Sequence, residues 1–190
     1  MNLILIQFTS TATAIFGIYF KLQSFFFMPV FGLNNGMVPI IAYNFGAGKR
    51  SRIVKTIRYS LVYAFMLMFL GFLAFQLIPA QLLGMFEASD EMLEIGVSAL
   101  RIIGVHFLIA WFCIIAGSVF QAVGNGVYSL IVSVARQLVI LLPAAYILAK
   151  IGGLALVWWA FPIAELMSFA VSATFLVITW KKVISKVPEN

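Results

Sequence analysis

Three long stretches of the chain carry no charged residue, and they constrain its fold more than any other feature. They are residues 22–48, 59–86 and 102–135 of the 190-residue chain. About 20 apolar residues are enough to cross a bilayer as a helix, so each stretch is long enough to span a membrane. Only 9% of the residues are charged, whereas a water-soluble domain carries about 25%. The sequence therefore predicts an all-α, polytopic transmembrane helix bundle.

Glycines, prolines and isolated charges divide the apolar sequence into separate spans. The stretch 102–135 is too long for one crossing at about 1.5 Å per residue, and Gly124, Asn125 and Gly126 mark a turn within it. With this turn, the sequence predicts about five transmembrane helices. They cover about residues 12–45, 58–83, 93–123, 127–149 and 154–180.

Basic residues cluster after the first and the last of these spans. One cluster lies in a predicted basic loop at 49–58 and the other in the C-terminal tail. Lys and Arg are enriched in cytoplasmic loops, so both clusters are expected on the cytoplasmic side of the cell membrane, where the loop can bind anionic lipid headgroups. The acidic loop at 87–94 is then external, and so is residue 1. A chain that starts at the external end of a helix is expected to be part of a longer or split polypeptide.

Several function classes are excluded by the composition and the motifs. The 12 basic residues lie scattered between apolar runs, so they form no phosphate-binding face and nucleic acid is not an expected partner. We find no metal-ligand cluster, no catalytic triad and no phosphate loop in the sequence. The single cysteine, Cys113, excludes a disulfide framework and is expected to pack as a small hydrophobe. An enzyme, a metal and a cofactor are therefore not expected.

The most specific motifs lie in and just after the first span, with FGIYFKLQS at 16–24, MPVFGLNNGMVP at 28–39 and YNFGAGKR at 43–50. The segments LRII at 100–103, FQAVGNG at 120–126, and RQ at 136–137 followed by LP at 142–143 come after it in order. This ordered set resembles the multidrug and toxic compound extrusion (MATE) transporters. The resemblance covers nearly the whole chain from about residue 11.

The resemblance implies one incomplete lobe of a two-lobe transporter. Members of the family have about twelve helices and exchange cationic or amphiphilic drugs for Na⁺ or H⁺, and this chain would supply helices eight to twelve of the C-terminal lobe. The expected partners are membrane lipid, a drug-like small molecule and the missing N-terminal lobe, in the same or a separate chain. The lobe alone is expected not to transport. Two alternatives stay open, a non-transporting split-gene half or scaffold subunit and a lipid-linked glycan flippase.

The resemblance leaves the coupling ion undetermined. Familiar acidic coupling residues of the family lie on helix one, helix seven or helix ten. The span 93–123 would be helix ten, and it has no Asp or Glu beyond Glu94 at its edge. No coupling carboxylate can therefore be transferred to this chain, and Na⁺ and H⁺ stay equally open.

Ionisable residues inside a span are functional candidates, because placing them in a bilayer costs about 2.5 to 3.5 kcal/mol. His106, Arg136 and Glu165 are such residues. At about 1.5 Å per residue they lie roughly 20, 20 and 17 Å from the external ends of their spans. Arg136 and Glu165 can form a structural ion pair, or Glu165 can be a cation or proton site with His106 as a nearby titrating group. Spacing does not fix the directions in which they face, and His106 alone can be a hydrogen-bonded packing residue.

The first span also contains breakers and polar residues. Two prolines and two glycines are expected to weaken its hydrogen bonding and produce a bent, cavity-lining helix or a static kink; they are Pro29, Gly32, Gly36 and Pro39. Lys21 is interpreted as an interfacial anchor or as a cavity wall. The complete set of candidates for a substrate or cation pathway is Glu165, Arg136, His106, Asn34, Asn35, Gln23 and Lys21.

Overall fold

The fold is a bundle of helices, seen here in a computed structural model that describes residues 1–188. The helices are α1 (Asn2–Leu5), α2 (Ser10–Gly46), α3 (Arg50–Leu77), α4 (Pro79–Gly84), α5 (Asp90–Gly104), α6 (Phe107–Ala122), α7 (Gly126–Val134), the π-helical segment η1 (Ala135–Leu141), α8 (Leu142–Val157), α9 (Ala160–Lys182) and the 3₁₀ turn η2 (Ile184–Lys186). No strand occurs within residues 1–188. The predicted all-α class is confirmed.

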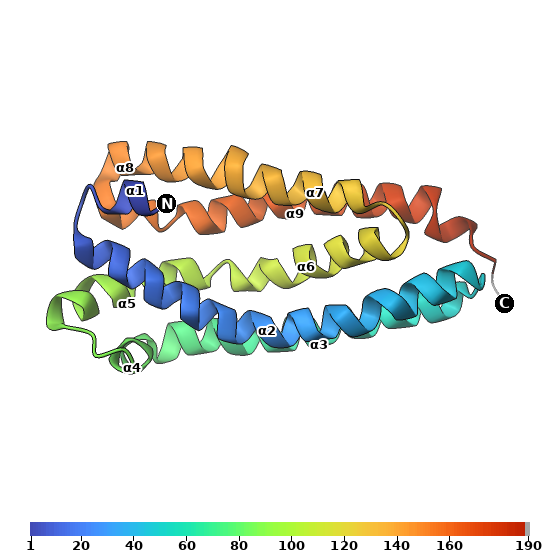
Figure 1. Cartoon of the computed structure of the whole chain (residues 1–190), viewed down its shortest axis with the longest axis horizontal. Helices are drawn as coiled ribbons and strands as arrows, with labels where there is room; N and C mark the ends of the chain where they lie inside the picture. The colour runs from blue at the N-terminus through green and yellow to red at the C-terminus, as the bar shows by residue number, and fades with distance from the viewer. Residues whose placement is uncertain (189–190) are drawn as a thin grey trace.

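The long helices run side by side, with α6 between two layers (Figure 1). Helices α2 and α3 pack together on one side of α6, and α9 and α7 contact its other side. The short helix α1 packs against α2 and α8. Because α6 touches both layers, its side chains form much of the interior, including Phe107, Ile115 and Val119, which have no exposed surface.

Within residues 1–188, four helical stretches are long and apolar enough to cross a membrane, namely Ser10–Gly46, Arg50–Leu77, Gly126–Val157 and Ala160–Lys186. Helices α5 and α6 form a pair bent by 47° that gives a fifth span if the pair crosses as one. The predicted count of about five agrees with this arrangement when the bent pair is counted once.

The bend between α5 and α6 lies at His106. The backbone N–H of His106 donates to the carbonyl oxygen of Ile103 at 3.0 Å, and its ring Nδ1 lies 2.6 Å from the same oxygen. These i to i−3 contacts replace the regular α-helical ladder, which ends α5. Gly104 permits a close approach just before the bend, because a Cβ there would lie 2.8 Å from the Cβ of Phe75.

Several predicted boundaries need correction. The basic loop at 49–58 is wrong from Arg50 onward, because α3 begins there; Arg and Lys are good helix formers, so this helix continues beyond its apolar part. Helix α3 ends at Leu77, before Pro79, rather than near 83. The backbone leaves the α-helical region at Gly152 and Gly153, close to the predicted end at 149, but α9 begins at Ala160 rather than at 154.

The breakers in the first span do not end α2, which is assigned as one helix through Pro29 and Pro39. Both prolines, Gly32 and Gly36 are not buried, and a Cβ added at either glycine would meet no atom within 4 Å. In a membrane, the backbone groups that a proline frees are tolerated where a neighbouring helix, a side chain or water satisfies them. These residues therefore lie on a face of α2 that the described residues leave open.

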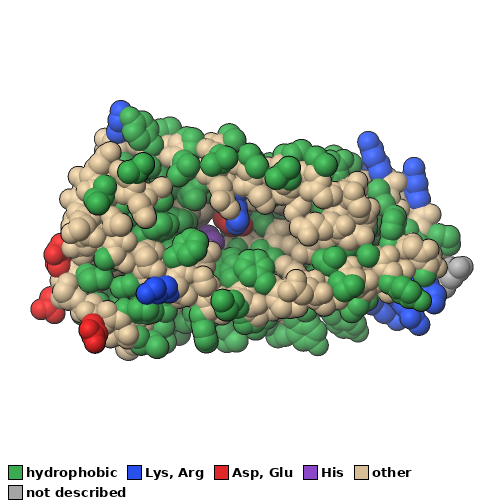
Figure 2. Space-filling view, in the orientation of Figure 1, with side chains coloured by type: hydrophobic (Ala, Val, Ile, Leu, Met, Phe, Trp, Pro, Cys, Tyr) green, Lys and Arg blue, Asp and Glu red, His purple; other side chains and the backbone are tan. Residues whose placement is uncertain are grey.

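The acidic side chains gather at one end of the bundle and most of the basic side chains at the other (Figure 2). We call these ends the basic end, with residues 49–58 and Lys181, Lys182 and Lys186, and the acidic end, with residues 87–94. The C-terminal tail reaches the start of α3, where the N–H of Arg50 donates to the carbonyl oxygen of Pro188 at 3.4 Å. Both predicted basic clusters therefore lie at the same end of the bundle.

Candidate functional site

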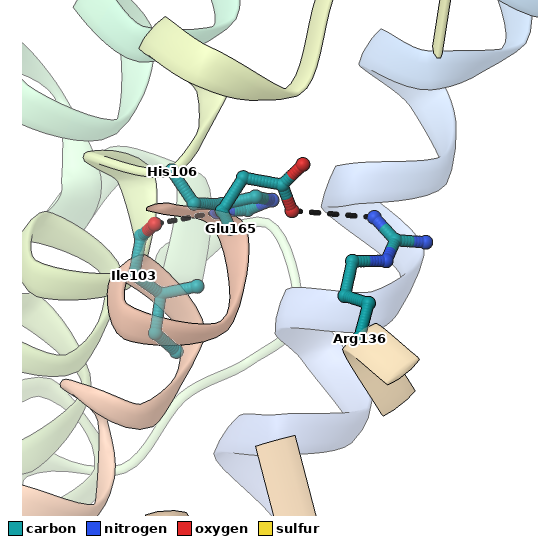
Figure 3. Close-up of polar contacts among 4 residues, drawn as sticks. All are labelled: Ile103, His106, Arg136 and Glu165. Carbon is teal, nitrogen blue, oxygen red and sulfur yellow. Dashed lines mark hydrogen bonds and ion pairs between the residues drawn. The ribbon is translucent and has the colours of Figure 1, made fainter. Parts of the chain in front are cut away.

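An ion pair joins η1 to α9 in the interior of the bundle. Nη1 of Arg136 lies 3.2 Å from Oε2 of Glu165, and the two side chains are 31% and 3% exposed. Figure 3 shows the guanidinium reaching from its helix toward the carboxylate. The other oxygen, Oε1 of Glu165, is buried and has no hydrogen-bond partner in the described chain. One oxygen of this buried carboxylate is thus paired and the other is not.

His106 lies beside this pair, as Figure 3 also shows. Its Nδ1 is 2.6 Å from the carbonyl oxygen of Ile103, which can only accept a hydrogen bond, so Nδ1 carries a proton. The ring is buried among aromatic rings, with centroids 4.7 Å from Phe107, 6.0 Å from Phe27 and 6.3 Å from Tyr19. In the neutral imidazole, Nε2 is then the acceptor.

Two cavities adjoin the ion pair. The smaller, of about 240 Å³, is the aromatic cavity, lined mainly by Phe16, Tyr19, Phe20, His106, Phe161 and Glu165. The larger, of about 440 Å³, is the polar cavity, lined by Asn34, Gln121, Ser129, Ser133, Ser168 and other residues. Arg136 lines both cavities. Figure 2 shows a hollow in the middle of this face, with the purple histidine side chain inside it.

The structure brings most of the predicted pathway residues together. Glu165, His106 and Gln23 line the aromatic cavity, and Asn34 and Asn35 line the polar one. Lys21 is the exception. It is exposed, lines neither of these cavities, and has its Nζ 5.6 Å from the ring centroid of Phe86. This position favours its interpretation as an anchor over that of a cavity wall.

Sequence reasoning missed a row of small polar side chains on α9. Ser168, Ser172 and Thr179 are buried, and their hydroxyl oxygens have no hydrogen-bond partner in the described chain. With Glu165 they follow spacings of three, four and seven residues, which place them on one helical face. That periodicity could have revealed the row. Cys113 of α6 lines the polar cavity together with Ser168, the first hydroxyl of this row.

The arrangement suits ligand binding by electrostatics and stacking. Residues 1–188 contain no group of three or more His, Cys, Asp or Glu side chains that could hold a metal ion. The aromatic cavity instead combines one carboxylate with several ring faces, which attract an organic cation. Gln23 adds an amide that can donate or accept a hydrogen bond.

Comparison with known proteins identifies the family. The MatE family model matches residues 1–147, which is most of the chain. The chain belongs to the MatE family. Among curated MatE-type relatives, Multidrug export protein MepA of Staphylococcus aureus (strain MSSA476) is 28% identical over 180 residues, covering 94% of this chain and 39% of the relative. MepA of Staphylococcus haemolyticus is 28% identical over 165 residues, or 87% of this chain and 36% of the relative.

Solved structures of MATE transporters share the fold. The outward-facing conformation of a multidrug resistance MATE family transporter superposes with a TM-score of 0.88 at 21% identity, over 97% of this chain and 42% of that one. The MATE multidrug transporter DinF-BH superposes with a TM-score of 0.81 at 32% identity, over 96% of this chain and 40% of that one. The chain thus spans about two fifths of the length of these MatE relatives, as one lobe would. Glu165 lies beyond the part matched by the family model.

Proposed function

We propose that this MatE chain is the C-terminal lobe, helices eight to twelve, of a multidrug exporter that exchanges cationic or amphiphilic compounds for Na⁺ or H⁺. Its place is the cell membrane, with the basic end and the C-terminal tail in the cytoplasm. Family membership and the names of the relatives support drug export. The positive-inside rule supports the orientation, because both basic clusters lie at one end.

The observation that carries this proposal is the half-paired carboxylate of Glu165 in the aromatic cavity. A buried carboxylate needs a partner, and here Arg136 supplies only one contact. An organic cation can occupy the open side, where ring faces and the carboxylate attract it together. A proton or Na⁺ that binds the same carboxylate would exclude the drug. Competition for one carboxylate is a sufficient basis for exchange.

Transport also needs a second lobe. Alternating access arises when two helix bundles move against each other around a central site, and this chain spans about two fifths of its relatives. We therefore propose that the chain alone does not transport and that it works together with an N-terminal lobe. If such a lobe is present and transport still fails, the result would favour the alternative that the chain is a non-transporting scaffold subunit. The polar cavity is lined by one charged residue, Arg136, and this disfavours a pyrophosphate-linked glycan.

Dye efflux tests the proposal. The chain is expressed in an efflux-deficient bacterium, alone or with the N-terminal lobe of a MatE relative, and ethidium efflux is followed by fluorescence. We expect efflux only when both lobes are present, and its loss in Glu165→Gln. Lys55→Gln, which removes an exposed charge at the basic end, serves as the control and should retain efflux. Efflux by the chain alone in liposomes would overturn the proposed requirement for a second lobe.

The same two-lobe preparation identifies the coupling ion. Proteoliposomes are given either a Na⁺ gradient or a pH gradient, and ethidium movement is measured in each. Response to one gradient alone identifies the ion. Efflux in Glu165→Gln at the rate of the unmodified protein, under both gradients, would refute a coupling role for this carboxylate.

A further inference from the structure

Arg136 faces two cavities of opposite chemical character. The aromatic cavity contains the Glu165 carboxylate. None of the described residues that line the polar cavity is acidic, and its walls are rich in amides and hydroxyls, including Asn34, Gln121 and Ser133. The guanidinium is the only full charge among these lining residues. The lining of the polar cavity therefore offers one cationic group and no anionic group, whereas a site that takes cations is expected to offer an anionic one.

The polar cavity also contains unused hydrogen-bond donors. Arginine has five N–H donors, and the described chain engages Arg136 through Nη1 alone. Ser168 is 2% exposed and its hydroxyl has no partner in the described chain, although it lines this cavity. Gln121 donates from Nε2 to Oγ of Ser129 at 3.1 Å, so the wall between α6 and α7 is already fixed. A positive charge and a buried free hydroxyl are the groups that an oxyanion needs.

We propose that the polar cavity binds the oxyanion group of an amphiphilic ligand, with Arg136 as the charged donor and Ser168 as a neutral donor. The site goes beyond the cation exchange proposed above, and its occupancy does not require transport. A carboxylate of a soluble compound and the phosphate of an anionic lipid share this chemistry. A cavity of about 440 Å³ can enclose the oxyanion together with part of its apolar body.

Binding there would change the aromatic cavity as well. An oxyanion competes with Glu165 for the same guanidinium, and Arg136 can turn toward the polar cavity because it already lines it. The carboxylate of Glu165 would then lose its partner and attract a cation more strongly. Occupancy of one cavity by an anion and of the other by a cation would therefore be mutually favourable.

A matched pair of probes tests the oxyanion site. The full chain in neutral detergent is titrated by calorimetry with 2-naphthoate, an aromatic carboxylate, and with 2-naphthamide, a neutral compound of nearly the same shape. Titrations into empty micelles correct for partitioning. We expect naphthoate to bind about tenfold more tightly than naphthamide, which corresponds to ~1.4 kcal/mol.

Variants assign this preference to Arg136. Glu165→Gln removes the competing carboxylate, so it should raise the affinity for naphthoate and leave that for naphthamide unchanged. Arg136→Gln combined with Glu165→Gln removes both charges, which avoids leaving either one buried alone, and should abolish the preference. Lys21→Gln removes a charge outside the two cavities and should leave the preference intact.

Equal affinity for the two probes in the unmodified chain would overturn the proposal. A preference that survives in the double variant would overturn it as well. Adding phosphatidylglycerol identifies the source of the oxyanion, since competition with naphthoate indicates a lipid headgroup and its absence indicates a soluble carboxylate. Because no second lobe and no efflux enter this assay, its result is independent of the proposed exporter function.

Discussion

Removing the charges of Arg136 and Glu165 one at a time and together tests whether they act as one unit. Glu165 is nearly enclosed, while Arg136 is 31% exposed and reaches into two cavities. Arg136→Gln would leave an enclosed carboxylate without its cation. Glu165→Gln would leave a guanidinium that still has cavity space around it. We therefore expect Arg136→Gln to be the more destabilising single substitution.

The size of the effect follows from the geometry of the pair. Unit charges separated by the observed 3.2 Å attract each other by about 5 kcal/mol at an effective dielectric constant of about 20. Desolvation of Glu165 and partial solvation of Arg136 oppose this attraction, so we expect a loss of about 3 kcal/mol in unfolding free energy for Arg136→Gln. The double substitution should cost under about 1 kcal/mol, because neither charge is left alone.

The chain contains a natural reporter for this measurement. Cys113 is its single cysteine and is 7% exposed, so a thiol-reactive fluorogenic dye reports thermal unfolding through one known position. A loss of about 3 kcal/mol should lower Tm by roughly 6 to 12 °C in a protein of this size. Lys55→Gln, at the exposed basic end, is the control with an expected shift near zero. Additive single effects in the double variant would refute the reasoning.

Two further predictions concern the glycines of the helices and the accessibility of Cys113. Gly104→Ala should lower Tm by roughly 2 to 12 °C, because its Cβ would lie 2.8 Å from that of Phe75, and overpacking costs about 1 to 3 kcal/mol. Gly32→Ala, which meets open space on α2, should raise Tm by up to about 4 °C. A higher Tm in both variants would contradict the helix packing. Saturating 2-naphthoate should slow the reaction of Cys113 with a charged thiol reagent below the unfolding temperature, because this residue lines the polar cavity; an unchanged rate would place the probe elsewhere.

The level of the central residues could be predicted from the sequence. Counting residues from the span ends gave His106, Arg136 and Glu165 similar depths, because every helical residue advances the chain by about 1.5 Å. The structure places all three at the aromatic cavity. To estimate how deep a residue lies in the membrane, only the ends of its helix must be known. The charges and glycines in the sequence indicate these ends closely enough to place the three residues at one level.

The directions in which side chains face could not be predicted in the same way. Each residue rotates by about 100° along a helix, so an error of one residue in register moves a side chain to another face. Lys21 and Gln23 illustrate this, since they are two residues apart and only Gln23 lines the aromatic cavity. The bend at His106 was missed for a related reason. The bend lies next to the close approach of Gly104 to Phe75, a contact between distant parts of the sequence that residue spacing does not indicate.

The position of Arg136 links a sequence feature to the site. Proline lacks an N–H, and its ring clashes with the carbonyl four residues earlier, which for Pro143 is that of Val139. That carbonyl lies in η1, the π-helical segment that ends at Leu141, and a wider turn is one way to move it aside. The same segment contains Arg136, which lines both cavities. A return of η1 to α-helical geometry would change the rotation between Arg136 and the residues after the segment by about 100°. We therefore interpret Pro143 as the residue that holds the arginine between the two cavities.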